Sequence, residues 1–154
     1  MEYLGPKEPD LRAIPEKIWK KTSLYCGPTV LCAITRADGD TIKTLIRQQT
    51  GRTRITGTCA GELRMVLKRL AGYRMFMVLS FEKDEAKPTL AAWLRSRTAD
   101  QRKRCYIINI TGHWVAVQGN RFLDSKTDGK TVPTGEAPGR RKRVHAVYMI
   151  AGRG

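Results

Sequence analysis

The chain carries a thiol and an imidazole, far apart in the sequence, that could form a nucleophile–base pair. Cys26 stands directly before Gly27 and Pro28, and His113 stands directly before Trp114. Pro28 suits the first turn of a helix, so Cys26 is expected at a helix N-terminus, where unpaired backbone N–H groups lower the pKa of a thiol. Nucleophilic catalysis also needs a nearby base and a group that orients it. Cys26 and His113 are therefore the first candidates for catalytic residues.

A predicted hairpin selects Asp124 as the partner of His113. Gly119-Asn120 is a two-residue turn signal between two strand-like segments, 113–118 and 121–125. Such a turn pairs Gln118 with Arg121, Val117 with Phe122, and Val115 with Asp124. Asp124 is then the diagonal neighbour of His113 on the same face, about 7–8 Å away between backbones, where a carboxylate reaches an imidazole N–H. A shift of one residue in the hairpin would place the two on opposite faces.

Each of these residues also has an ordinary structural interpretation. A cysteine beside a helix start commonly belongs to the core, a lone histidine at a strand start is commonly structural, and Asp124 could be a surface acid near a turn. The three together are less expected by chance than any one alone, which favours a Cys26–His113–Asp124 site.

The chain offers one rival nucleophile and one rival base. Cys59 also lies where a helix is expected to begin, but Glu62 in the first turn of that helix would work against a thiolate. His145 follows the basic run 140–143 and has no acid close in sequence. Both rank below Cys26 and His113.

The four cysteines, Cys26, Cys32, Cys59 and Cys105, show no metal or disulfide pattern. None are spaced as C-x-x-C, which argues against a zinc ribbon or a thioredoxin-type redox site. The first 21 residues are mixed and charged, unlike a secretory signal, so free thiols in a reducing compartment are expected. We expect no metal and no cofactor.

Helix signals occur before most of the strand signals. The expected helices run from Gly27-Pro28 to Asp38-Gly39, from an Asp40 cap to Gly51, from Thr58 or Cys59 to Gly72, and from Pro88 through Leu94. The expected strands are 73–81, 105–110, 113–118, 121–125 and 144–150. This order predicts an α+β domain with N-terminal helices on a C-terminal antiparallel sheet. We expect an extended arm at 1–18, one domain at 19–154, and a basic, mobile loop at 126–142.

The residues around the thiol and the imidazole resemble the papain-like cysteine peptidases, in particular the bacterial bacteriocin-processing (double-glycine leader) peptidase group. The matching text is Tyr-Cys-Gly-Pro-Thr at 25–29 and Gly-His-Trp-Val-Ala-Val at 112–117. Segments 57–63, 67–73 and 89–94 resemble the helices between the two motifs, so the resemblance covers roughly residues 19–125. It implies that Cys26 is the nucleophile, His113 the general base and acid, and Asp124 the orienting residue. The implied reaction is acyl transfer through a thioester, usually peptide hydrolysis, without metal or cofactor.

The chain departs from this family where the oxyanion hole is completed. The family places a glutamine about six residues before the cysteine, and here Lys20 occupies that position. Losing one oxyanion donor typically costs on the order of 10²–10³ in rate. Lys20, Thr22 or Ser23 could substitute for the glutamine, or the chain is a member without catalytic activity. Asp124 also follows the histidine sooner than is usual in the family, which the tight hairpin explains.

The charge of the chain suggests a second class of function. Lysine and arginine number 29 against 14 acidic residues, a net charge of +15 that favours an anionic partner such as nucleic acid. The densest run is Arg140, Arg141, Lys142 and Arg143, and two further basic stretches lie at 95–104 and 47–54. Few aromatic residues interleave with them, so contacts would be to phosphates rather than to stacked bases. A solvated basic face without a partner explains the same charge.

Two functions follow from the sequence. The first is a cysteine peptidase or amidase acting on a peptide or protein. The second is a papain-like fold without activity, serving as a nucleic-acid-associated binding or structural protein, such as a phage virion component. Either would act in the cytoplasm or within a virion, and no apolar run approaches the roughly 20 residues of a membrane helix.

Overall fold

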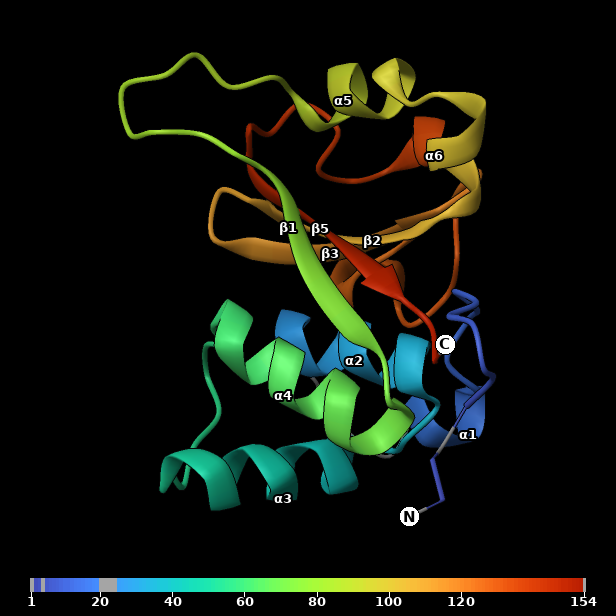
Figure 1. Ribbon diagram of the computed structural model, residues 1–154, viewed down its shortest axis with the longest axis vertical. Coiled ribbons are helices and arrows are strands. Elements are labelled where there is room, and N and C mark those ends of the chain that lie inside the picture. The colour runs from blue at the N-terminus through green and yellow to red at the C-terminus, as the bar shows by residue number, and fades with distance from the viewer. Residues whose placement is uncertain (1, 4, 20–24, 154) are drawn as a thin grey trace.

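The computed structural model describes residues 2–3, 5–19 and 25–153, and they form an α+β domain built around one antiparallel sheet. Figure 1 shows helices α2, α3 and α4 on one side of the sheet and α5 and α6 on the other. The sheet has five strands in the order β1-β5-β2-β3-β4, all of them antiparallel to their neighbours. The α+β class expected from the sequence is therefore confirmed. No helix of the described residues is long and apolar enough to cross a membrane.

Helix α2 (Cys26–Thr35) is the buried centre of the helical layer. It contains no charged residue, and every residue after Cys26 is buried. Helices α3 (Gly39–Thr50) and α4 (Ala60–Ala71) are amphipathic and pack against it, each ending at a glycine with positive φ, Gly51 and Gly72. A helix with polar residues on one side covers the core, whereas α2 can only exist inside it.

The start of α3 differs from the sequence expectation. Its N-cap is Asp38, not Asp40, because the Asp38 carboxylate accepts a hydrogen bond from Thr41 N–H at 2.7 Å. Asp40 falls in the first turn of the helix. Both residues are aspartates, so residue type does not choose between them. Asp38 is the cap because its carboxylate meets the N–H of Thr41, three residues further along the chain.

The strands follow the predicted segments closely. They are β1 (Arg74–Ser80), β2 (Cys105–Ile110), β3 (His113–Gln118), β4 (Arg121–Leu123) and β5 (Val144–Ala151). Strand β4 ends before Asp124 and Ser125, which were expected within it, because Asp124 caps the 3₁₀ helix η1 (Ser125–Thr127).

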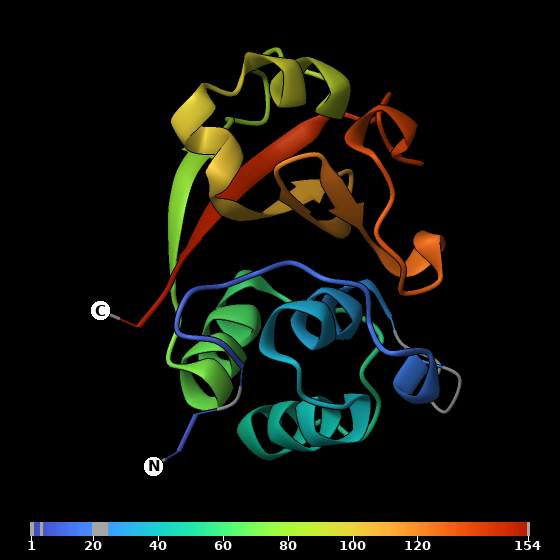
Figure 2. The same cartoon turned by 90° about the vertical axis from the view of Figure 1, so that its right-hand side faces the viewer.

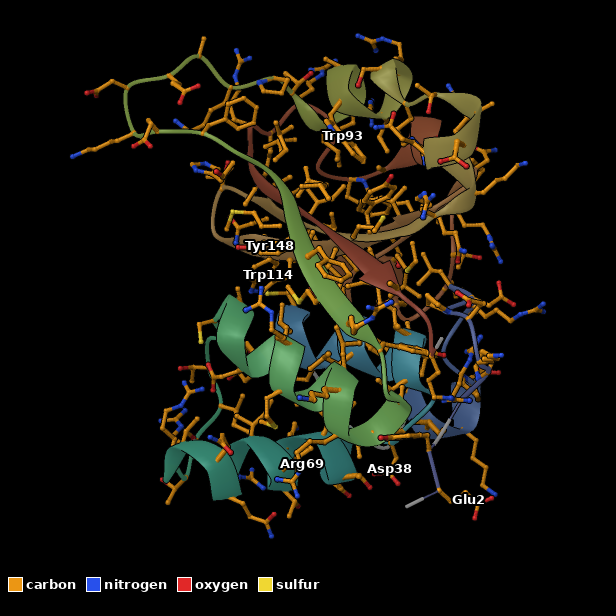
Figure 3. All side chains as sticks on the ribbon, in the orientation of Figure 1. Glu2, Asp38, Arg69, Trp93, Trp114 and Tyr148 are labelled. Atoms are coloured by element: carbon orange, nitrogen blue, oxygen red, sulfur yellow. The ribbon has the colours of Figure 1, made fainter. Side chains whose placement is uncertain are left out.

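Side-chain alternation along the strands creates one core on each face of the sheet. Trp114 and Ala116 of β3 face the α2–α4 layer, whereas Val115 and Val117 face α5. Figure 3 shows Trp114 and Tyr148 between the sheet and the helical layer, and Trp93 on the far side of the sheet beside α5. The site residues on β3 are thus anchored between two packed layers.

The helices on the second face differ from the sequence expectation in two ways. Helix α5 (Leu90–Ser96) begins two residues after Pro88, because the Thr89 hydroxyl accepts a hydrogen bond from Ala92 N–H and caps it. Helix α6 (Ala99–Lys103) was not expected, and it is held by a capping box between Thr98 and Gln101.

The segment 126–142, expected as a loop, contains the end of η1 and a second 3₁₀ helix, η2 (Thr134–Glu136). Val132 pairs with Phe122 through two backbone hydrogen bonds of 2.8 and 2.9 Å, which extends the sheet beside β4. The turn at 140–142 is bonded to the first residues of α5. This segment therefore connects β4 to the face that carries α5.

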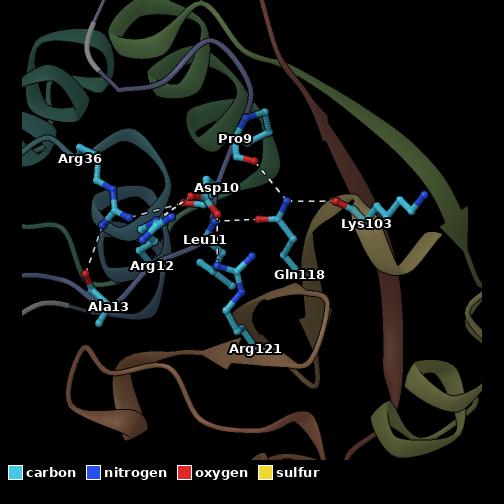
Figure 4. Close-up of polar contacts among 9 residues, drawn as sticks. All are labelled: Pro9, Asp10, Leu11, Arg12, Ala13, Arg36, Lys103, Gln118 and Arg121. Atoms are coloured by element: carbon cyan, nitrogen blue, oxygen red, sulfur yellow. Dashed lines mark hydrogen bonds and ion pairs between the residues drawn. The ribbon is translucent and has the colours of Figure 1, made fainter. Parts of the chain in front are cut away.

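The N-terminal arm is built into the domain. Figure 2 shows it running between the helical layer and the sheet, and it ends in the short helix α1 (Glu16–Trp19). Leu11 and Ile14 are buried in the core. The Gln118 side chain accepts from Leu11 N–H at 2.7 Å and donates to Pro9 O and Lys103 O, as Figure 4 shows. The arm thus fastens the end of β3 to the helical layer.

Candidate active site

Cys26 is the first residue of α2, at the junction of the helical layer with the sheet. The residue before it, Tyr25, has extended backbone and offers no side-chain cap, and Pro28 has no N–H to be satisfied. The thiol is half-buried, whereas the rest of the helix is buried. A helix start without a capping side chain leaves its N–H groups available to the thiol.

Gly27 lets this helix start pack tightly against residue 58. A Cβ at position 27 would lie 2.6 Å from the Thr58 Cβ and closer still to its hydroxyl oxygen, so no larger residue fits without movement. The backbone oxygen of Thr58 accepts a hydrogen bond from the Trp114 indole N–H at 2.7 Å. Residues from α2, the start of α4 and β3 therefore meet at this point.

His113 is the first residue of β3 and follows a tight turn in which Thr111 and Gly112 both have positive φ. Its Nε2 lies 3.0 Å from Asp124 Oδ2. The Asp124 side chain is only 1% exposed, and its second oxygen accepts from the N–H groups of Lys126 and Thr127 at 2.9 and 3.1 Å. Both carboxylate oxygens are engaged, so the carboxylate is fixed in position and fixes the imidazole in turn.

The predicted hairpin is confirmed for two of its three pairs, and the third, Val115 with Asp124, lies beyond the regular pairing. Gln118 pairs with Arg121 and Val117 with Phe122, and regular pairing ends at Ala116 and Leu123. Asp124 then lies one residue beyond β4, diagonal to His113, and the two side chains meet. The Gly119-Asn120 turn thus sets a contact between residues 11 positions apart.

Cys26 and His113 hydrogen-bond through their side chains, and each changes the other's protonation. Burial is the strongest influence on the pKa of the Cys26 thiol and raises it, but the His113 side chain and the N–H groups of Trp114 and Gly27 together lower that pKa below its ordinary value. Asp124 first, and Cys26 second, raise the pKa of His113 to about 9. With Nε2 on Asp124, the Nδ1 atom remains for the thiol. Each partner therefore stabilises the charged form of the other, the thiolate of Cys26 and the imidazolium of His113.

The pKa values of the two buried cysteines, Cys32 and Cys105, are shifted in the opposite direction to that of Cys26. Burial raises the pKa of the Cys32 thiol to about 11 and that of the Cys105 thiol to about 12. All four thiols are free. Cys26 is distinguished from the other two by its hydrogen-bond donors and by its partial exposure.

Of the two rival residues, Cys59 lies beside Thr58 at the start of α4, and His145 lies on β5. Cys59 is exposed and caps α4, where its N–H donates to Glu62 Oε1 at 2.9 Å and Glu62 pairs with Arg52. His145 is exposed on β5. Among the described residues, the hydrogen-bond partners of the His113 ring are Cys26 and Asp124.

Two contributors to the site were missed by sequence reasoning. The backbone N–H of Trp114 donates to the Cys26 sulfur. The indole N–H of Trp114 donates to the backbone carbonyl of Thr58, which holds the side chain in place. The position of Trp114 directly after His113 was a usable signal for the first. The second is a contact between distant segments that no local pattern shows.

Lys20 and Ser23, the candidates for an oxyanion donor, lie outside the described residues, as does Thr22. Among the groups that are described, the Cys26 N–H is an α2 donor with no partner inside the helix. Directly before it, Tyr25 borders a hollow of about 180 Å³. The other residues lining this hollow are Lys43, Arg47, Thr53, Arg54, Ile55 and Thr56.

The basic run at Arg140, Arg141, Lys142 and Arg143 is exposed in the turn before β5, beside α5. In Figure 1, α5 lies across the sheet from α2, which carries Cys26. The structure thus places this run and the thiol on different faces of the sheet. Among the described residues, no group of three or more histidine, cysteine or acidic side chains could hold a metal ion.

Comparison of the chain with protein family models, with curated proteins and with solved structures finds no match.

Proposed function

We propose that the protein is a papain-like cysteine peptidase or amidase that acts through a thioester on Cys26. The observation that carries this proposal is the chain of contacts from Cys26 through His113 to the buried carboxylate of Asp124. It supplies a lowered thiol pKa, a base with a raised pKa and a fixed orienting group, which are the requirements of thiol-based acyl transfer.

The proposed reaction begins with attack of the Cys26 thiolate on the carbonyl carbon of an amide bond. The carbonyl oxygen takes up the negative charge. Among the described groups, we assign the stabilisation of that charge to the backbone N–H of Cys26 at the start of α2. The His113 imidazolium then gives its proton to the departing nitrogen, the carbon–nitrogen bond breaks, and the acyl group remains on sulfur as a thioester.

Hydrolysis of the thioester reverses these roles. Neutral His113 takes a proton from a water molecule, and the resulting hydroxide attacks the thioester carbonyl. The carbon–sulfur bond breaks, the acid product leaves, and Cys26 returns as a thiolate beside imidazolium. Asp124 keeps Nε2 protonated throughout, so that Nδ1 is the atom that exchanges protons. The enzyme and all protons are restored after one cycle.

The proposed substrate is a peptide or protein, and the hollow bordered by Tyr25, the residue before Cys26, is the place proposed for a residue next to the cleaved bond. Four free thiols favour a reducing compartment, and we propose the cytoplasm or a virion assembled there.

Incubation of the protein with a diverse peptide mixture, followed by mass spectrometry of new termini, tests this function. We expect cleavage by the wild type and its loss in Cys26→Ala, with Cys59→Ala, the exposed cysteine, as the matched control. Cleavage that persists in Cys26→Ala, or no cleavage together with no acylated Cys26 in an amide- and ester-substrate screen, contradicts the proposal.

A further inference from the structure

An arginine-lined hollow lies on the face of the sheet opposite α2. It has a volume of about 460 Å³ and is bordered by α5, α6, η2 and the turn before β5. Figure 1 shows α5 and α6 on the far side of the sheet from the helix that carries Cys26. Its charged lining consists of Arg95, Arg97, Arg102, Arg140 and Arg141. The hollow therefore belongs to neither the thiol nor its immediate surroundings.

Arg97 is the buried member of this group. The residue is only 5% exposed, and its Nε donates to Leu94 O at 3.1 Å. Its Nη1 is buried and has no hydrogen-bond partner among the described residues. Burial first, and the nearby charge of Arg102 second, lower the pKa of Arg97 from its ordinary value. The guanidinium carbon also lies 6.0 Å from the centre of the Trp93 ring, but a buried cationic N–H without an acceptor is destabilising.

The backbone holds the arginines of the turn in a defined place. Arg140 O accepts from Ala91 N–H at 2.9 Å, and Lys142 O accepts from Leu90 N–H at 2.8 Å. These two bonds fasten the 140–142 turn to the first residues of α5, whose last turn leads directly to Arg97. The fold thus places the exposed arginines of this turn close to buried Arg97.

No carboxylate of the described residues forms an ion pair with these arginines. The ion pairs among the described residues involve other cations, and none of the five arginines takes part in one. The neighbouring acid Asp100 pairs with Arg104 at 3.2 Å, and Glu136 of η2 is exposed. Five like charges around one hollow repel each other, and an anion in the hollow would offset that repulsion.

We propose that this hollow binds consecutive phosphate groups. The guanidinium group presents paired N–H donors that match phosphate oxygens, and the lining contains arginines and no lysine. A free oligophosphate and the backbone of a nucleic acid share this chemistry. The site does not depend on the proposed thiol reaction, so either can fail without the other.

Calorimetric titration of the full chain with inorganic tripolyphosphate and with a short single-stranded oligonucleotide tests the site. The variants are Arg97→Gln and the exposed pair Arg140→Gln with Arg141→Gln. Lys68→Gln with Arg69→Gln on α4, also an exposed adjacent pair, is the control with the same loss of charge. We expect at least about a tenfold weaker Kd in both hollow variants, because charged hydrogen bonds are lost, and little change in the control.

The two ligands separate the sources of phosphate. Tighter binding of the oligonucleotide, with the same sensitivity to the variants, identifies a nucleic-acid backbone, whereas tighter binding of tripolyphosphate identifies a free oligophosphate. Absence of binding of both at low salt overturns the proposal. Equal weakening by the hollow and control variants also overturns it, because that result shows only a general attraction to a basic protein. The exposed Arg140 and Arg141 keep the test valid if Arg97→Gln does not fold.

Discussion

His113 Nε2 lies 3.0 Å from Asp124 Oδ2, and the other oxygen of that buried carboxylate is held by the N–H groups of Lys126 and Thr127. Because each carboxylate oxygen has its own hydrogen-bond partners, the Asp124 side chain is held in one position. The imidazole that it orients is the one that contacts the Cys26 thiol.

Asp124→Asn should leave the fold intact and impair the thiol. Asparagine keeps an oxygen that can cap η1 but loses the charge that raises the pKa of His113 to about 9, so that pKa should fall toward the ordinary value of about 6.5. We expect the reactivity of Cys26 toward iodoacetamide at neutral pH to drop, and any peptidase rate to fall on the order of 10²–10⁴. NMR titration of His113 measures the pKa directly. Asp128→Asn, at an exposed turn residue with positive φ, should change neither quantity, and an unchanged His113 pKa in Asp124→Asn would refute the assigned role.

Gly27→Ala should destabilise the protein and disturb the site. The new methyl group would overlap the side chain of Thr58, so the start of α2 or the segment before α4 must move, at a cost of about 1–3 kcal/mol in the free energy of unfolding. Gly57→Ala is the matched control, because a Cβ there meets no atom within 4 Å. Chemical denaturation of both variants measures the difference. Equal stability of the two would show that α2 does not pack against Thr58 as described.

The cysteines should be alkylated in a defined order. Cys32 and Cys105 are buried, with pKa values raised to about 11 and about 12, and should remain unmodified in the folded protein. Cys26 should react faster than exposed Cys59, because its thiolate is stabilised by His113 and by two N–H groups. Peptide mapping after a brief exposure to iodoacetamide gives the order. We expect the four cysteines to be alkylated at similar rates only in denaturant. Similar rates in the folded protein would contradict the predicted order.

The arm before α1 should contribute to the stability of the whole domain. Leu11 is fully buried and its N–H is bonded to Gln118 of β3, so Leu11→Ala should cost about 2–5 kcal/mol in the free energy of unfolding. Arg12→Ala, at the exposed neighbour, should change it by less than about 1 kcal/mol. Urea denaturation compares the two. A small effect of Leu11→Ala would mean that the arm is not part of the cooperative unit.

Local signals explain why part of the structure could be predicted from the sequence. Strands β2 and β3 were predicted with their observed bounds, because turn residues limit both and their side chains are nearly all apolar. The Gly119-Asn120 turn predicts the register, and the register predicts the meeting of His113 with Asp124. These contacts lie within one hairpin, where the turn fixes the pairing of the few strand residues next to it.

Contacts between distant segments explain the rest. Gly27 packs closely against Thr58, and Arg97 lies near Arg140. Both arrangements depend on how whole layers pack, which no spacing in the sequence shows. The choice of Asp38 over Asp40 as a cap is a difference of two residues between equivalent acids. Helix α6 did carry a signal, the Thr98-x-x-Gln101 capping box, but it is too short and polar to show a periodic apolar face.

The pH dependence of Cys26 alkylation tests the central claim most directly. The rate of iodoacetamide modification is measured by mass spectrometry between pH 5 and 10, in the wild type and in His113→Ala. The account predicts that the midpoint of the wild-type profile lies at lower pH than that of His113→Ala, because the imidazole lowers the pKa of the Cys26 thiol. Superimposable profiles for the two proteins would contradict the claim that His113 activates Cys26.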